Sequence, residues 1–249
     1  MSTRLLQTTK GIVLRTVKYG ETSLIVKVYT ELFGIQSYLL NGVRTASPKG
    51  SAKAHYFQPA AILELVVYHN ELKKLQRVRE YKWAHLYQQL FFDIHKNSVA
   101  LFIVELLQKI LRQPEPNPDL FAFLEDALLH LDEASPAVTA NFPLFMLTQL
   151  TYFSGFRITD SYSSVTSILD LQEGRFVADP PAHMHVAGEP HSAIVSQLLQ
   201  VMQPRELEDF ALNQETRRAL LKIFLTFFDL HIPEFGKLKT VSVLQSILT

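Results

Sequence analysis

No cysteine occurs among the 249 residues of the chain. Disulfide bonds, thiol nucleophiles and zinc or iron–sulfur sites with thiolate ligands are therefore excluded. The absence is compatible with a reducing compartment such as the cytoplasm. We expect no cofactor and no bound metal.

Long uninterrupted apolar runs are also missing. An apolar stretch from Val99 to Leu111 is broken by Glu105, Gln108 and Lys109, which disfavours a membrane-spanning helix. The opening sequence MSTRLLQTTKG lacks the apolar core of a signal peptide. We therefore expect neither export nor a membrane partner. A hydrophobic content of 47% with 19% charged residues predicts a globular protein.

Recognisable catalytic motifs are missing as well. The chain has no phosphate-binding Gly-Lys-Ser/Thr loop, no Gly-x-Ser-x-Gly elbow and no His-Glu-x-x-His helix. The paired acids Asp132-Glu133 and Glu208-Asp209 have no visible metal-binding companion. A metal-dependent nuclease can still assemble acids from distant positions, but we expect a protein that is not an enzyme.

Charge is divided unevenly along the chain, although the formal net charge is +0. Residues 1–80 hold twelve Lys and Arg against five Asp and Glu, a net charge of +7. Residues 81–249 hold twelve against nineteen, a net charge of −7. A basic module joined to an acidic one indicates a polyanionic partner for the basic module, although the acidic part blunts long-range attraction at physiological salt.

The first eighty or so residues have the pattern of short β-strands. Runs rich in β-branched and aromatic residues are separated by turn signals such as Gly20 and Gly34. Five such strands predict a small barrel, and a five-stranded Greek-key barrel of the OB type is the best candidate. The expected strands are Gly11–Tyr19, Ser23–Thr30, Ile35–Asn41, Ala61–Tyr68 and Leu75–Tyr81.

From Trp83 onward the pattern is helical. The first helical run ends at the proline-rich segment 113–119. We therefore expect an α+β protein, with a nucleic-acid-binding barrel at residues 1–81 and a helical domain at residues 82–249. The helical runs cover residues 99–110, 120–131, 142–153, 191–202, 215–231 and 237–248.

One stretch of the helical part, residues 157–190, is irregular. Its sequence ILDLQEGRFV predicts a hairpin around Glu173-Gly174, and the following ADPPAHMHVAGEP has the composition of a loop. Three histidines lie in or beside that loop, but no fourth ligand has a suggestive spacing, so solvated side chains are favoured over a metal site. These histidines are His183, His185 and His191.

Basic residues fall where OB barrels commonly hold single strands, on the middle strands and in the turns after strands one and four. Alternation places Lys27 and Tyr29 on the face opposite the barrel-filling residues Leu24, Val26 and Val28. In the last strand, three cations have the same parity and should line one face; they are Lys73, Arg77 and Arg79.

A basic loop between the third and fourth strands, NGVRTASPKGSAKAHYF, contains no acidic residue. A single exposed lysine often serves only to block edge pairing, so the concentration of cations is what indicates nucleic-acid binding. Tyr19, Tyr29, Phe33 and Tyr38 are candidate stacking platforms, although Tyr29 and Tyr38 are better explained as core or rim residues. The candidate DNA-binding residues are Lys18, Lys27, Arg44, Lys49, Lys53, Lys73, Lys74, Arg77 and Arg79.

Several short motifs, in order, resemble the RecO family of recombination mediators. Residues 10–44 contain Gly-Ile-Val-Leu, Tyr-Gly-Glu and Gly-Val-Arg, and Gln58-Pro59 follows. Near the end, FFDLHIPEFGKLKTVSVL is similar to the family's closing pattern of a helix, a His turn and the start of the last helix. The resemblance implies an OB barrel followed by a helical domain.

The resemblance also implies a function. RecO proteins bind single- and double-stranded DNA, anneal complementary strands and help to load RecA onto strands coated by single-strand-binding protein, usually with the partner RecR. They are not enzymes. Arg44, in the matched Gly-Val-Arg motif, is the strongest candidate for holding DNA phosphates. A cytoplasmic, nucleoid-associated protein is expected.

The sequence departs from the family in one place. Many members carry a four-cysteine zinc module after a Gly-Phe segment, whereas no cysteine follows Gly155-Phe156 here. We infer that this zinc site is lost and that side-chain packing holds the region together. The side chains expected to do so are Ile168, Leu169, Leu171, Phe176 and Val177.

The resemblance further implies that the helical domain docks the acidic, Phe-terminated C-terminal tail of single-strand-binding protein, which requires an apolar pocket flanked by cations. A solvated helix face is the alternative for each cation. The candidates are Arg217, Arg218, Lys222, Lys237 and Lys239.

A second class of function stays open, in which the barrel of a protein-only adaptor docks a peptide. That function predicts binding that is insensitive to changes at Arg44, Lys49 and Lys53.

Overall fold

The computed structural model describes residues 5–44 and 53–247. The chain divides into two compact units, Met1–Gln88 with Val104–Leu129 and Gln89–Ile103 with His130–Thr249. Each unit is made of two separate stretches of the chain. The expected boundary between residues 81 and 82 stays a prediction.

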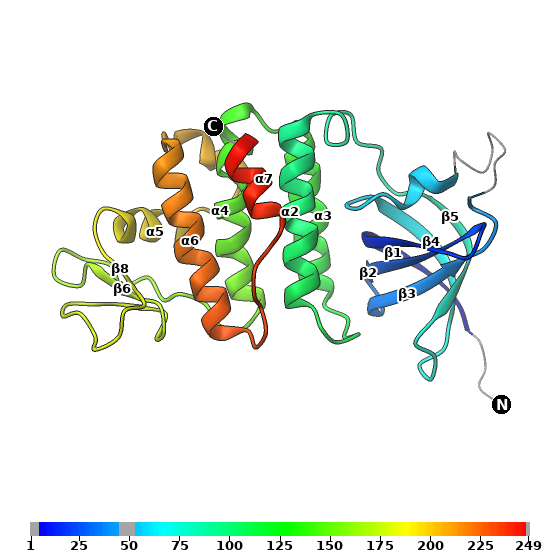
Figure 1. The fold of residues 1–249 in the computed structure, drawn as a ribbon, viewed down its shortest axis with the longest axis horizontal. Helices are drawn as coiled ribbons and strands as arrows, with labels where there is room; N and C mark the ends of the chain where they lie inside the picture. Colours follow the sequence, from blue (N-terminus) through cyan, green and yellow to red (C-terminus); the bar gives the residue numbers. More distant parts are fainter. Residues whose placement is uncertain (1–4, 45–52, 248–249) are drawn as a thin grey trace. The chain divides into compact units, whose positions relative to one another are not determined.

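Five strands form a closed barrel in the first unit (Figure 1), which confirms the α+β class and the five-stranded OB-type barrel. Their spatial order is β1-β2-β3-β5-β4. Neighbouring strands are antiparallel, except that β3 and β5 pair in parallel where the barrel closes. The strands are β1 (Leu5–Tyr19), β2 (Ser23–Thr30), β3 (Gly34–Leu40), β4 (Ile62–His69) and β5 (Gln76–Trp83).

Alternation along β2 fills the barrel as expected, because Leu24, Val26 and Val28 are all buried. Tyr29 points to the other face, yet it is only 1% exposed. The part of helix α3 (Pro118–Glu133) that belongs to the same unit covers that face, where the Tyr29 ring lies 5.9 Å from the ring of Phe121. Packing from a distant helix thus converts an outer barrel position into a core position.

The largest differences from the expected strand bounds are at the start of β1 and the end of β5. β1 begins six residues earlier than predicted, because its first half pairs with β4 and its second half with β2. The prediction of helix from Trp83 is wrong, since Trp83 is the last residue of β5 and pairs with Leu63 of β4. The Trp83 ring also stacks on Tyr56 at a centroid distance of 4.9 Å. The first described helix after the barrel begins only at Ile94.

The turn between β2 and β3 depends on Gly34. Its φ of +59° favours glycine, and an added Cβ would lie 2.3 Å from the backbone oxygen of Glu115. Gly34→Ala should therefore lower the free energy of unfolding by about 1 kcal/mol for the backbone strain and about 1–2 kcal/mol more for the clash. Chemical denaturation measures this loss.

Gly20 provides the control, because its φ is +57° and an added Cβ would meet nothing within 4 Å. Gly20→Ala should show the backbone strain alone. Equal losses in the two variants would show that the close approach of Gly34 to Glu115 carries no cost.

The remaining chain is mostly helical, as predicted. Serine and asparagine begin two helices by side-chain capping, since Ser135 accepts a hydrogen bond from the Val138 N–H and Asn213 accepts one from the Thr216 N–H. No helix in the described part of the chain is long and apolar enough to cross a membrane. The helices are α2 (Ile94–Ile110), α3 (Pro118–Glu133), α4 (Pro136–Phe153), α5 (His191–Leu199), α6 (Gln214–His231) and α7 (Thr240–Ile247).

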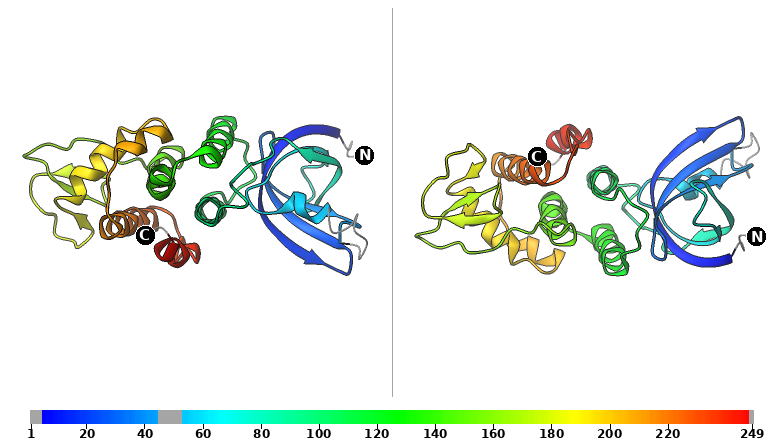
Figure 2. Two further views of the ribbon diagram at one scale, coloured as in Figure 1. Left: turned by 90° about the horizontal axis from the view of Figure 1, so that it is seen from above. Right: turned by 90° about the horizontal axis from the view of Figure 1, so that it is seen from below.

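Helix α4 is the central helix of the second unit. It packs against α5, α6 and the short 3-10 helix Pro204–Asp209, and Figure 2 shows α4 beside α5 and α6. Contact on several sides explains why twelve of its residues are buried rather than a single stripe.

A three-stranded sheet occupies the irregular region, with β6 (Ile168–Asp170) between β7 (Arg175–Val177) and β8 (Val186–Ala187). The predicted hairpin is confirmed, because β6 and β7 pair across a turn that contains Gly174 at φ +63°. The expectation of a plain loop after β7 is wrong, since β8 lies in it. Leu169, Leu171 and Phe176 are buried as expected, whereas Ile168 and Val177 are half-buried.

The histidines near this sheet are not all solvated. The His183 side chain is 24% exposed, and its Nε2 atom lies 3.3 Å from the Asp170 carboxylate. Within residues 5–44 and 53–247, no group of three His, Cys, Asp or Glu side chains is arranged to hold a metal ion. The structure accordingly shows an ion-pair geometry for His183 where the sequence favoured solvent.

Candidate nucleic-acid interface

Arg44 is attached to the turn between β1 and β2. Its N–H donates to the Thr22 carbonyl at 2.9 Å, and its guanidinium Nη1 donates to the Gly20 carbonyl at 3.3 Å. Since a guanidinium has five N–H donors, this bond positions the side chain and leaves it capacity for phosphate. Lys18 and Tyr19 lie exposed at the end of β1, directly before the turn. We call Lys18, Tyr19 and Arg44 the turn cluster.

Lys27 faces another cation that the sequence reasoning missed. A register shift after Val13 places Arg15 directly opposite Lys27 in the β1–β2 pair. Arg15 is exposed and Lys27 half-buried, so both belong to the outer face of the barrel. Like charges directly opposite each other destabilise a sheet. A polyanion bound between them would relieve that repulsion.

Two aromatic candidates are core residues and have no face for a base. Tyr29 is 1% exposed and Tyr38 is 0% exposed. The Tyr29 hydroxyl donates to the Asn117 carbonyl at 3.1 Å, and burial raises the pKa of Tyr29 to about 12. Burial also raises the pKa of Tyr38. Tyr19, which is 53% exposed, has an open ring.

The cations near β5 do not form the single row that was expected. β5 begins at Gln76, so Lys73 lies with Lys74 in the β4–β5 turn. The register of the β4–β5 pair shifts between Val66 and Val67, which leaves Arg79 as an extra residue of β5 without a partner in the register. Because Lys73 lies outside β5, alternation along the strand does not place it in one row with Arg77 and Arg79.

Gln76 shapes the turn that presents Lys73 and Lys74. It is buried, and its Nε2 donates to the carbonyls of Asn70 and Lys73, both at 2.7 Å. The two lysines are exposed on this ordered turn.

The other barrel cations differ in their surroundings. Arg77 is exposed, whereas Arg79 lies 3.1 Å from Glu80 in a surface pair that contributes little to stability. Lys53 is exposed beside the short helix His55–Phe57. Lys49 lies outside the described residues.

Three of the five predicted partner-binding cations line a groove of about 910 Å³ between α6 and the segment 235–245. Leu221, Leu225 and Leu238 line it together with Arg218 and Lys222. Lys237 contributes a third cation to the lining. We call this the docking groove, and its chemistry suits an acidic chain with an apolar end.

Two of the five predicted partner-binding residues lie elsewhere. Arg217 is half-buried and its guanidinium donates to the Leu212 carbonyl, while burial lowers its pKa. Lys239 is exposed just before α7 and is not among the described residues that line the docking groove.

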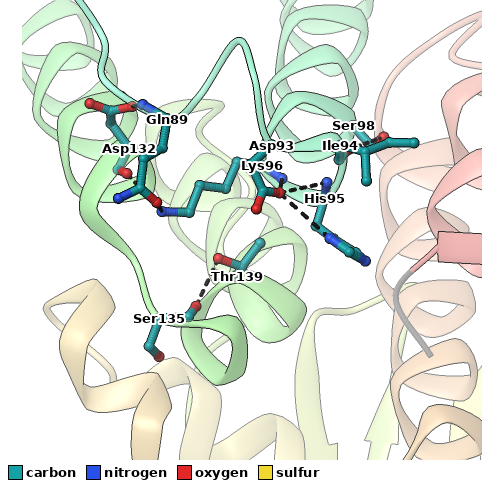
Figure 3. Close-up of polar contacts among 9 residues, drawn as sticks. All are labelled: Gln89, Asp93, Ile94, His95, Lys96, Ser98, Asp132, Ser135 and Thr139. Atoms are coloured by element: carbon teal, nitrogen blue, oxygen red, sulfur yellow. Dashed lines mark hydrogen bonds and ion pairs between the residues drawn. The ribbon is translucent and has the colours of Figure 1, made fainter.

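A polar network in the second unit gives Asp132 a structural role. Its Oδ1 accepts hydrogen bonds from the N–H groups of Gln89 and Leu90 at 2.8 and 2.6 Å. The Lys96 ammonium donates to the Asp132 carbonyl and to Gln89 Oε1, at 2.7 and 2.8 Å (Figure 3). Lys96 is 5% exposed and Asp132 3% exposed.

Next to this network, Asp93 caps the N-terminus of helix α2. Asp93 accepts hydrogen bonds from the N–H groups of His95 and Lys96, and the bond from Lys96 is the main reason that the Asp93 pKa is lowered. The acid pair noted in the sequence is thus explained at Asp132 by backbone contacts. The expectation that the protein is not an enzyme stays a prediction.

Models of known protein families match both halves of the chain. The family model Recombination protein O N terminal matches residues 1–87, and Recombination protein O C terminal matches residues 92–240. A curated relative from Phocaeicola vulgatus, named DNA repair protein RecO, is 32% identical over 246 residues, which are 98% of this chain and 100% of the relative.

Two further relatives carry the same name. The Bacteroides fragilis protein is 33% identical over 246 residues, covering 98% of this chain and 99% of the relative. The Flavobacterium psychrophilum protein is 32% identical over 241 residues, covering 97% and 98%. The chain therefore belongs to the RecO family.

Proposed function

We propose that this protein is a DNA-repair recombination mediator, which binds single- and double-stranded DNA through its barrel and anneals complementary strands. Family membership supports a role in DNA repair. The observation that carries the finer proposal is the gathering of cations from separate segments on the barrel, with Arg44 held at the β1–β2 turn and Arg15 opposite Lys27.

The mechanism follows from charge. Cations on the barrel neutralise phosphates and release counterions, which reduces the repulsion between two complementary strands. The exposed ring of Tyr19 offers a surface on which an unpaired base stacks. The barrel contributes no bond-making chemistry in this mechanism.

The second unit directs this activity to DNA that is coated by single-strand-binding protein. We propose that the docking groove takes the acidic, Phe-terminated tail of single-strand-binding protein, with the phenylalanine against Leu221 and Leu225 and the carboxylates near Arg218, Lys222 and Lys237. RecR is the proposed working partner and RecA an indirect one. A cytoplasmic, nucleoid-associated location follows from that role.

The test is binding of a fluorescent single-stranded oligonucleotide over a series of salt concentrations. Each lost phosphate contact should reduce the slope of log affinity against log salt by about 0.7. The double variant Lys27→Ala/Arg44→Ala should therefore lose about 1.4 from the slope, and it should anneal complementary strands more slowly than the unchanged protein.

Lys10→Ala/Lys82→Ala is the matched control, since it removes the same charge from two lysines that already pair with Glu125 and Glu64. Its slope should stay near that of the unchanged protein. A slope that is equally reduced in both variants would contradict a specific site. Absence of binding at low salt would favour the peptide-docking adaptor.

A further inference from the structure

A second basic groove lies in the first unit, away from the turn cluster. It has a volume of about 600 Å³ and runs between the β2–β3 turn, the β4–β5 turn and the segment 112–116. All of its lining residues belong to the same compact unit. Among them are three cations, Lys73, Lys74 and Arg112, and one acid, Glu71.

An aromatic pair is part of the lining of this groove. The rings of Phe33 and His69 stack with centroids 3.9 Å apart and planes inclined by 12°. The Phe33 N–H donates to Thr30 Oγ1 at 3.1 Å, and the Phe33 carbonyl accepts from Gln36 Nε2 at 2.9 Å. These contacts, with the ordered Lys73–Lys74 turn, keep the groove formed before any ligand arrives, which lowers the cost of binding.

Cations beside aromatic rings match the chemistry of unpaired nucleic acid. Phosphates suit the ammonium and guanidinium groups, and base–aromatic stacking contributes roughly 1–3 kcal/mol per base. A base in a duplex is stacked and paired, so only an unpaired base has a free face for the rings. The groove therefore favours single strands over duplex DNA.

The aromatic pair and the turn cluster lie at opposite ends of β2. The turn cluster adjoins Ser23, where the strand begins, and Phe33 follows its end at Thr30. With a rise of about 3.3 Å per residue, the eight-residue strand separates them by roughly 23 Å. A stacked tetranucleotide, with about 3.4 Å between successive bases, is too short to reach both.

We propose that the groove is a second seat for single-stranded DNA, which holds one unpaired segment while the turn cluster holds another. The proposal deepens the proposed function and rests on it, because it assumes that the barrel binds DNA. Two seats on one barrel bring two unpaired segments close together without requiring a second copy of the protein.

The test is photocrosslinking of a 4-thiothymidine tetranucleotide to the full chain, with crosslinked peptides mapped by mass spectrometry. Crosslinks should appear on the peptide that contains Phe33 and on the one that contains Tyr19. Lys73→Ala/Lys74→Ala should reduce the Phe33 crosslinks about tenfold at low salt and spare those at Tyr19. Lys18→Ala/Arg44→Ala should do the reverse.

The outcomes separate the second seat from the proposed function. Crosslinks at Tyr19 alone would overturn the second seat and leave DNA binding by the barrel intact. Equal losses at both peptides in both variants would show one continuous site and would also overturn it. Crosslinks at neither peptide would count against the second seat and the proposed function together.

Discussion

Asp132→Ala should lower the free energy of unfolding by about 3–5 kcal/mol. The carboxylate is 3% exposed and accepts two backbone hydrogen bonds, from Gln89 and Leu90. Removing it leaves these donors without their acceptor and removes a negative charge from the surroundings of the buried Lys96 ammonium. Thermal and urea unfolding measure the loss, and thermal midpoints should fall by several degrees.

Asp132→Asn separates the two causes. An asparagine keeps an oxygen that can accept from both N–H groups but carries no charge, so it should recover part of the stability. Glu133→Ala is the control, because Glu133 is the exposed neighbour in the sequence. If Asp132→Ala were as stable as Glu133→Ala, the network would not hold the segment before α2.

Lys222→Glu/Lys237→Glu should weaken binding of a synthetic acidic peptide that ends in phenylalanine about 100-fold. Both lysines line the docking groove, and reversing their charge places carboxylates beside the carboxylates of the peptide. Charge reversal should weaken binding more than replacement of the two lysines by alanine, because like charges then face each other. Isothermal titration calorimetry with the full chain measures the affinity of the peptide.

Two controls make this result specific. Arg157→Glu/Arg205→Glu reverses two exposed charges outside the groove lining, and it should change the affinity much less. A peptide without its final phenylalanine should bind weakly to every variant, since Leu221, Leu225 and Leu238 then have nothing to cover them. Equal weakening in both charge-reversal variants would point to general electrostatic attraction instead of a site.

Local patterns predicted the strands well where packing is also local. The bounds of β2 came directly from alternation, because its inner face is filled by the barrel itself. Trp83 was misplaced because an aromatic residue followed by a helical pattern does not reveal pairing with Leu63, twenty residues earlier. Periodicity describes a segment, whereas pairing depends on its neighbours in space.

The candidate site was predicted less completely for the same reason. Arg44 was identified from a motif, and its contact with Gly20 explains how it is placed. Arg15 was missed because a register shift in β1 sets its position opposite Lys27, and a shift of this kind has no signal in alternation. The burial of Tyr29 depends on Phe121, which lies far along the chain.

The spatial order of the barrel has a consequence for how the chain matures during synthesis. β5 emerges last of the five strands but lies between β3 and β4. Until it is made, the first four strands form only an open sheet, with β3 at one border and β4 at the other. Insertion of residues 76–83 then completes the cylinder, so the closed barrel forms in one late step that a nascent chain shorter than this cannot take.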